Sequence, residues 1–116
     1  MTSPFRVEAE NVDGVQAFKV VGELDQATAP GLSQPLMEAI ETGAERVLVD
    51  LTDCEFIDST GLAIIVEAHE RTGEKARAFA ICCSNSQVQR LLQITGIDRA
   101  MDLHPTRDAA LAALRA

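Results

Sequence analysis

The first part of the chain carries the alternation of apolar and polar residues that is typical of β-strands. Residues 5–10 alternate in this way, and residues 15–21 form a second extended run after the turn dipeptide Asp13-Gly14. Two extended runs joined by so short a turn predict an antiparallel β-hairpin. We expect this hairpin to lie at one edge of the sheet.

The next segment has the spacing of an amphipathic helix. Gly43 is suited to the position just after its last turn. The sequence does not decide where this helix begins, because Thr28 and Ser33 are both suitable N-caps. If the helix begins at Thr28, Pro35 lies inside it and removes one backbone hydrogen bond. The apolar residues that recur about one turn apart are Leu32, Leu36, Met37 and Ile40.

The middle of the chain predicts a buried strand, a loop and a second helix. Residues 46–51 are almost continuously apolar, as expected for a parallel strand that is buried on both faces. Residues 52–57 are interpreted as a loop. The helix that follows ends before Gly73, and its inward stripe consists of Leu62, Ile65, Val66 and His69.

Two further pairs of strand and helix are predicted. A strand at residues 78–83 precedes a helix that Ser84 or Asn85 caps and that stops at Gly96. A short strand at residues 100–103 precedes a closing helix, for which Thr106 is a suitable N-cap. The sequence therefore predicts a single α/β domain over residues 1–116, with a mixed, mostly parallel sheet, the hairpin at its edge and about four helices.

Composition excludes several classes of partner. Apolar residues make up 47% of the chain and charged residues 24%, as in ordinary globular domains. The 18 Asp and Glu against 10 Lys and Arg give a net charge of −8, which repels nucleic acid backbones and anionic membranes. We therefore expect no direct nucleic acid or membrane partner, and a basic surface on another protein suits this charge better.

The cysteines and the absence of targeting signals predict a cytoplasmic protein without a cofactor or metal. No secretory signal and no apolar run long enough to cross a bilayer is present. The spacing of Cys54, Cys82 and Cys83 fits neither a disulfide framework nor a zinc site, and we interpret them as small buried apolar residues. Cys82 and Cys83 should point to opposite faces of their strand, and a redox role for the three thiols is left open.

The segment from Phe56 to Leu62 carries the candidate chemistry, because it joins the buried strand to the second helix. Strand ends that meet helix N-termini are where sites gather in such sheets. Here Asp58 is followed by Ser59, Thr60 and Gly61. In a structural interpretation the two hydroxyls cap free N–H groups of the first turn, worth about 1 kcal/mol. In a functional one, the same N–H groups and the helix dipole favour a phosphate, for which Gly61 leaves room.

Phosphorylation at this position would act as a switch. It would add about −1.5 to −2 charges beside Asp58 and near Glu23 and Asp25. Because the helix terminus offsets part of the repulsion, the fold should survive. A partner that docks on this rim would have to desolvate an additional anion, so that binding fails instead.

Two motifs and the order of the elements resemble a known family. The stretches Gly22-Glu23-Leu24-Asp25 and Asp58-Ser59-Thr60-Gly61-Leu62, separated by a helix and a buried strand, are similar to the STAS domain of bacterial anti-sigma factor antagonists. Residues 90–97 and the helix at residues 109–114 fit the same family. The likeness covers nearly the whole chain, and it implies a STAS-like fold and a regulatory protein that is not an enzyme.

The resemblance also implies partners and residue roles. The unmodified protein would bind an anti-sigma factor with serine kinase activity and so free a sigma factor, and a serine phosphatase would reset the switch. The acceptor maps onto Ser59, with Thr60 as second choice. The proline-rich stretch at residues 28–35 differs from the family pattern and leaves the docking surface beside it open. The partner-binding residues by this mapping are Glu23, Asp25, Asp58, Ser59, Thr60 and Gly61.

Three other interpretations compete with this one. A two-component receiver domain would use Asp50 with Glu23 and Asp25, but it would not begin with a hairpin and would need a lysine where His104-Pro105 stands. A serine hydrolase would need a Gly-x-Ser-x-Gly elbow and a histidine partner for Ser59, and the sequence offers neither. The third keeps the STAS resemblance but makes the chain a stressosome-like scaffold or a transporter-associated subunit without a sigma factor partner.

Overall fold

A mixed six-stranded sheet forms the centre of the protein, and the computed structural model describes residues 3–115. The strands are β1 (Arg6–Val12), β2 (Val15–Leu24), β3 (Arg46–Asp50), β4 (Cys54–Ile57), β5 (Ala78–Cys82) and β6 (Asp102–His104). The helices are α1 (Ala29–Glu41), α2 (Ser59–Glu74), α3 (Ser86–Ile94), α4 (Ile97–Ala100) and α5 (Arg107–Arg115). The order of strands is β1-β2-β3-β5-β6, and β4 pairs with β2. The predicted α/β class and the mostly parallel sheet are confirmed.

The predicted hairpin is present and lies at one edge of the sheet. β1 pairs with β2 in antiparallel fashion along its whole length, and all other strand pairs are parallel. The turn residues Asp13 and Gly14 both have positive φ, at 51° and 87°. Two-residue hairpin loops of this kind need positive φ at both positions, which explains the Asp-Gly dipeptide.

The segment predicted as a loop at residues 52–57 is a strand for most of its length, so that prediction was wrong. β2 has ten residues, and β3 pairs only with residues 16–19 of it. The remaining backbone groups of β2 need partners. After a turn at residues 52–53 the chain extends again as β4, which pairs with residues 22–24 of β2. β3 and β4 thus share one neighbouring strand.

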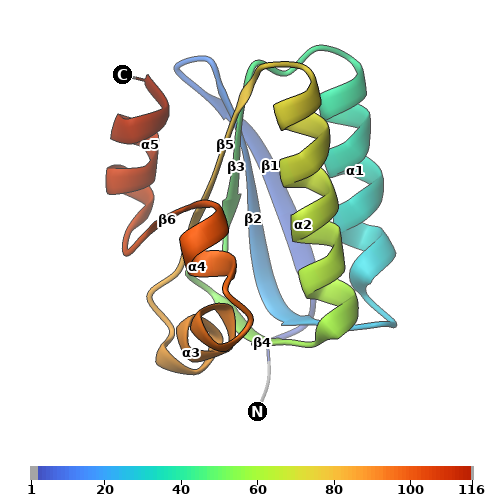
Figure 1. Cartoon of the computed structure of the whole chain (residues 1–116). Coiled ribbons are helices and arrows are strands. Elements are labelled where there is room, and N and C mark those ends of the chain that lie inside the picture. Colours follow the sequence, from blue (N-terminus) through green and yellow to red (C-terminus); the bar gives the residue numbers. More distant parts are fainter. Residues whose placement is uncertain (1–2, 116) are drawn as a thin grey trace.

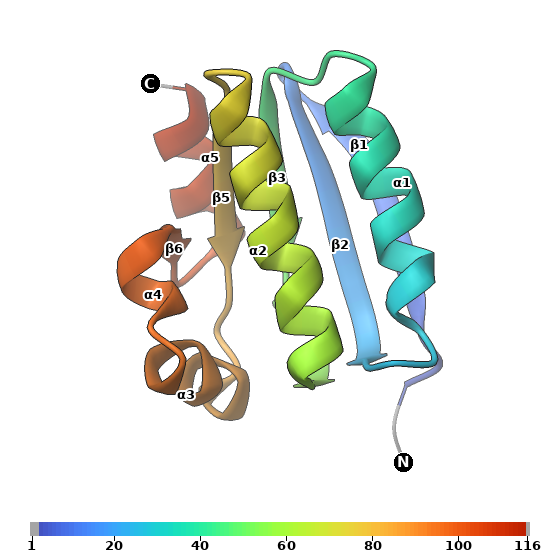
Figure 2. The same ribbon diagram turned by 45° about the vertical axis from the view of Figure 1, so that its right-hand side comes forward.

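Two layers of helices cover the sheet. Figures 1 and 2 show α1 and α2 side by side on one face, while α5 lies on the opposite face. The larger core cluster lies under α1 and α2, and a smaller cluster joins the sheet to α5. Cys83 belongs to the first cluster and Cys82 to the second, so the prediction that they face opposite ways is confirmed. Within residues 3–115, no helix is long and apolar enough to cross a membrane.

Two details at helix ends differ from the expectations. α1 begins after Thr28, which excludes Ser33 as its N-cap, and Pro35 lies inside the helix. The buried residues Leu32, Leu36 and Ile40 hold the helix across this proline. The second difference is the short helix α4, which was not predicted; it ends at Ala100, and the strand expected at residues 100–103 is observed as β6 at Asp102–His104. α3 and α5 start as predicted, with Asn85 and Thr106 accepting hydrogen bonds from first-turn N–H groups.

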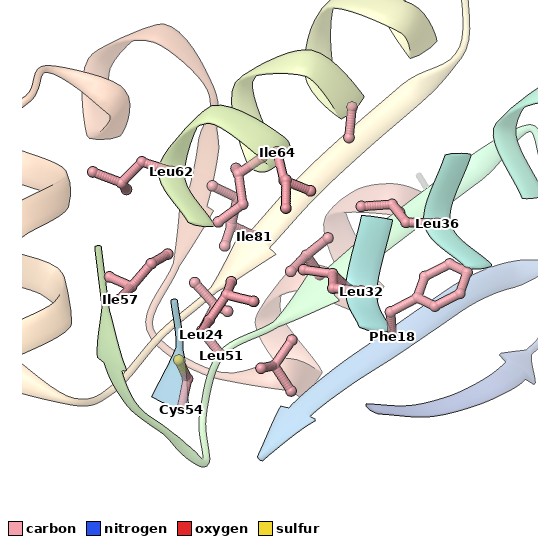
Figure 3. Close-up of a cluster of buried hydrophobic side chains, with 14 of the residues drawn as sticks. Phe18, Leu24, Leu32, Leu36, Leu51, Cys54, Ile57, Leu62, Ile64 and Ile81 are labelled. Carbon is pink, nitrogen blue, oxygen red and sulfur yellow. The ribbon is translucent and has the colours of Figure 1, made fainter. Parts of the chain in front are cut away.

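Gly61 lets the first turn of α2 approach the sheet. A Cβ atom at this position would lie 2.8 Å from Ile57 Cγ1 and 2.8 Å from Leu24 Cγ. Figure 3 shows these two side chains under the start of α2, within the core. The absent side chain therefore makes room for β2 and β4 on the inner side of the helix. This differs from the expectation that it leaves room for a phosphate.

We predict that Gly61→Ala destabilises the protein by about 1–3 kcal/mol, because it overpacks a filled core. Gly73→Ala is the matched control, since it lies in the same helix and a Cβ atom there would meet nothing within 4 Å. That control should be neutral or stabilising by up to about 1 kcal/mol. Urea unfolding of the two variants measures both effects, and equal stability of the two would contradict the packing role of Gly61.

Asp50 at the end of β3 forms an ion pair with Arg107 of α5, the helix on the face of the sheet opposite α1 and α2. It is 1% exposed, and its Oδ2 atom accepts a hydrogen bond from Arg107 at 3.1 Å while Oδ1 accepts from the Thr52 hydroxyl at 2.6 Å. Burial alone would raise the pKa of this carboxyl. The hydrogen bonds from Thr52, Cys82 and Arg107 outweigh burial and hold the pKa below its ordinary value. Arg107 also pairs with Glu10 on β1 at 2.6 Å.

We predict that this carboxylate stabilises the protein above its unfolded pKa, near 3.8, and that the contribution is lost as the pH falls through the lower pKa of the folded state. In urea unfolding between about pH 2 and pH 6, the wild type should lose stability more steeply on acidification than Asp50→Asn. Asp102→Asn is an exposed control, and it should follow the wild type. Parallel curves for Asp50→Asn and the wild type would exclude this role.

Candidate functional site

The candidate site lies where the carboxyl ends of β2 and β4 meet the starts of α1 and α2. Figure 1 shows both helices beginning at the same end of the sheet, next to β4. The loop at residues 25–28 leads from β2 into α1, and Asp58 alone connects β4 to α2. The structure therefore brings together the two motifs that the sequence analysis singled out, although 32 residues separate Gln26 from Asp58.

Asp58 is the residue that joins these two connections. Its Oδ1 atom accepts a hydrogen bond from the Gly61 N–H at 3.0 Å and so caps α2. Its Oδ2 atom accepts from the Gln26 N–H at 3.1 Å, which holds the loop before α1. Its own N–H donates to the Leu24 carbonyl of β2 at 3.1 Å. The cap predicted for a hydroxyl is thus provided by the carboxylate that precedes it.

The loop at residues 25–28 is organised by Asp25 and Thr28. The Oδ1 atom of Asp25 accepts from the N–H groups of Ala27 and Thr28 at 3.0 and 3.1 Å. The Thr28 hydroxyl accepts from the Asp25 N–H at 2.9 Å and donates to the Glu23 carbonyl at 2.7 Å. Asp25 therefore has a structural role in this loop, in addition to any contact with a partner. Thr28 was not singled out as a site residue, because its bonds are visible only in the folded loop.

Ser59 is the exposed hydroxyl of the site. It occupies the first position of α2 and is exposed, whereas Thr60 is half-buried and Gly61 is buried. Within residues 3–115 neither hydroxyl makes a hydrogen bond to the protein, and the Gly61 N–H is bound by the Asp58 carboxylate. The N–H groups of Ser59 and Thr60 also have no acceptor among the described residues. An oxyanion carried by Ser59 would find these two donors beside it.

The rim around Ser59 is acidic. Glu23, Asp25, Glu55 and Asp58 are all half-buried, and none of them forms an ion pair with Lys or Arg in the part of the chain that the structure describes. We call these four residues the acidic rim. Among residues 3–115, no group of three or more His, Cys, Asp or Glu side chains is arranged to hold a metal ion. The acidic groups of the receiver interpretation therefore do not form a metal site there.

An apolar groove adjoins the acidic rim and was not predicted. It has a volume of about 240 Å³ and lies between β4 and α3. Phe56 in its wall is 49% exposed. The pairing of β4 explains this, because the register shifts between Gly22↔Cys54 and Glu23↔Phe56, so that Phe56 turns outward and Ile57 turns into the core. The residues lining the groove are Glu55, Phe56, Ile57, Gln87, Val88 and Leu91.

The two histidines do not complete a hydrolytic site with Ser59. His69 lies on α2 with its ring 5.9 Å from that of Phe79, and His104 lies on β6. Neither forms a hydrogen bond with Ser59. His69 was expected to be partly buried with its hydrogen bonds satisfied, and only the first part is confirmed. Its Nδ1 atom is buried without a partner in the described structure, as is His104 Nε2.

The three thiols are buried, as interpreted from their spacing. Burial raises the pKa of Cys54 to about 11 and that of Cys82 to about 12, and it also raises the pKa of Cys83. The thiols therefore stay protonated near neutral pH. Since the thiolate is the reactive form, they are poor nucleophiles in the folded protein.

Comparisons with known proteins agree with this geometry. The family model for the STAS domain matches residues 6–110. The chain is 30% identical to the anti-sigma F factor antagonist of Paenibacillus polymyxa and 27% identical to the anti-sigma-F factor antagonist RsfB of Mycobacterium tuberculosis. These alignments cover 94% of both chains in the first case, and 99% of this chain and 95% of RsfB in the second.

A solved structure extends the agreement to three dimensions. The crystal structure of an anti-sigma factor antagonist from Mycobacterium paratuberculosis superposes with a TM-score of 0.93 at 31% identity, over 100% of both chains. The similarity thus includes the complete order of strands and helices. The chain belongs to the STAS domain family, in the group of the anti-sigma factor antagonists.

Proposed function

We propose that this protein is the phosphorylatable member of a partner-switching pair. In its unmodified form it binds an anti-sigma factor that has serine kinase activity, and this binding releases a sigma factor. The kinase then phosphorylates Ser59, and the antagonist dissociates until a serine phosphatase removes the phosphate. The observation that carries the proposal is the exposed Ser59 hydroxyl at the start of α2, free of any structural hydrogen bond within residues 3–115.

The geometry supports phosphoryl transfer to Ser59 more than to Thr60. In the transfer, the Ser59 hydroxyl oxygen attacks the terminal phosphorus of ATP held by the kinase, loses its proton and displaces ADP. The acceptor must therefore reach into another protein's active site, which suits an exposed side chain. Thr60 is half-buried, so that it remains the second choice. The protein itself supplies only the acceptor in this scheme, and catalysis belongs to the partner.

The modified protein should keep its fold but lose its partner. The free N–H groups of Ser59 and Thr60 and the positive end of α2 offset part of the charge of a phosphate. The acidic rim already carries four carboxylates, and a docked partner would have to bury an additional anion beside them. A coupling free energy of about 1–3 kcal/mol, the usual range for such switches, corresponds to a loss of affinity of about 5- to 150-fold.

We predict that Ser59→Ala abolishes phosphate incorporation but retains kinase binding, while Ser59→Glu weakens binding. Incubation with radiolabelled ATP and the anti-sigma factors encoded in the same genome, followed by mass spectrometry, reads out the modified residue. Thr60→Ala is the control, and it should be labelled like the wild type. Undiminished labelling of Ser59→Ala would move the acceptor to another residue. Binding to transporter or scaffold subunits alone would favour the alternative role of the STAS domain.

We also predict that the two neighbouring residues differ in their effect on stability. Asp58→Ala removes the cap of α2 and the anchor of Gln26, and should destabilise the protein by about 1–2 kcal/mol. Ser59→Ala removes no hydrogen bond and should change stability by less than about 0.5 kcal/mol. Thermal melts of both variants test this. A large loss for Ser59→Ala would mean that its hydroxyl is structural and not reserved for modification.

A further inference from the structure

A polar cavity lies beside the end of α2 that is remote from Ser59. Its walls come from the second half of α2, the start of β5 and the segment from the end of α4 to the start of β6. Figure 2 shows β5 between the two helices. The cavity has a volume of about 360 Å³. This volume lies in the range of cavities that hold small molecules in proteins.

The cationic side chains that form no ion pair gather at this cavity and at the one next to it. Six of the ten Lys and Arg side chains form ion pairs with Asp or Glu within residues 3–115. Arg77 and Arg99, which do not, line the cavity. Arg46 lines an adjoining cavity of about 450 Å³, and Arg77 belongs to both. Arg90 on α3 is the remaining one.

Arg77 is held in place while part of its guanidinium group is left without an acceptor. Its Nη1 atom donates to the carbonyl oxygens of Ile40 and Ala44 at 3.3 and 3.4 Å. Among the described residues, its Nε and Nη2 atoms have no acceptor, and the exposed Arg99 side chain has none either. Guanidinium groups bind carboxylates and phosphates through such N–H groups, in pairs of parallel hydrogen bonds.

Asp102 adds a second requirement for a ligand of this cavity. It also lines the cavity, is exposed and forms no ion pair in the part of the chain that the structure describes. An ionised carboxylate only accepts hydrogen bonds, so it repels a bare anion but binds a hydroxyl group. The arginines and Asp102 together therefore favour a molecule that carries both an anionic group and a hydroxyl.

We propose that this cavity binds a small oxyanion that also carries hydroxyl groups, such as a sugar phosphate or a hydroxycarboxylic acid. Arg77 and Arg99 bind the phosphate or carboxylate, and Asp102 accepts a hydrogen bond from a hydroxyl. The inference does not rest on the proposed function, because the cavity shares no residue with the acidic rim and does not include Ser59.

The net charge of −8 does not exclude such a ligand. At physiological salt the Debye length is about 8 Å, so exposed charges farther away than this are largely screened. The whole molecule is 36 Å long, and the acidic rim lies at the opposite end of α2. The two arginines in the cavity wall therefore act on the ligand more strongly than the distant carboxylates do.

The test titrates the full chain, labelled with ¹⁵N, with four probes and follows the amide signals by NMR. Glucose 6-phosphate and citrate are the hydroxylated anions, inorganic phosphate is the bare anion, and glucose is the neutral sugar. We expect at least one hydroxylated anion to shift the signals of residues 72–79 and 97–102. Inorganic phosphate should bind more weakly, and glucose should not bind. The comparison of glucose 6-phosphate with citrate distinguishes a phosphate ligand from a carboxylate ligand.

Arg99→Gln tests the arginines, because its side chain is exposed and makes no hydrogen bond within residues 3–115 that the fold would lose. It should weaken binding about tenfold or more, since a charged hydrogen bond to the ligand is removed. Arg90→Gln is the matched control. It removes the same charge from another exposed arginine without an ion pair, outside both cavities, and should bind like the wild type.

Three results would overturn the proposal. The first is the absence of signal shifts with both hydroxylated anions up to about 10 mM. The second is an equal loss of affinity in Arg90→Gln and Arg99→Gln, since binding would then follow the total charge and not the cavity. The third is binding of inorganic phosphate as tight as that of the hydroxylated anions, which excludes the role of Asp102. None of these results bears on the proposed function, because no anti-sigma factor takes part.

Discussion

The carboxylate of Asp58 is the interaction on which the candidate site depends. One oxygen caps α2 through the Gly61 N–H, and the other holds the Gln26 N–H in the loop before α1. Two connections far apart in the sequence are thereby fixed at one end of the sheet. The carboxylate provides the cap of α2, and the hydroxyl of Ser59 is exposed and makes no hydrogen bond within residues 3–115. The same residue thus shapes the site and leaves the hydroxyl of the proposed acceptor, Ser59, without a capping role.

The strand β4 gives the site its second property. It continues the sheet beyond β3 and pairs with residues 22–24 of β2. Its last residue, Ile57, directly precedes Asp58. The shift of register near Glu55 turns Phe56 away from the core and opens the groove toward α3. An acidic rim and an apolar groove consequently share one edge of the molecule. In protein interfaces generally, charge controls mainly the rate and selectivity of association.

Much of the fold follows from local patterns in the sequence. The hairpin depends on the Asp13-Gly14 turn, and the main helices on periodic apolar residues between identifiable caps. The errors concern segments whose state depends on distant partners. β4 has only four residues, and it is extended because the free edge of β2 lies beside it. Similarly, α1 tolerates Pro35 because its apolar face is buried against the sheet.

The sequence by itself determined the order of the main strands and helices apart from β4 and α4, the resemblance to the family, and the position of two hydroxyls after an aspartate at a helix entrance. It did not determine which of these side chains caps the helix, since Asp58, Ser59 and Thr60 are all suitable by residue type. Only the tertiary structure decided that Asp58 does so, that Gly61 faces the core and that Phe56 faces outward. The physical reason is that burial and hydrogen bonding depend on neighbours in space, which for these residues come from β2, the loop before α1 and α3.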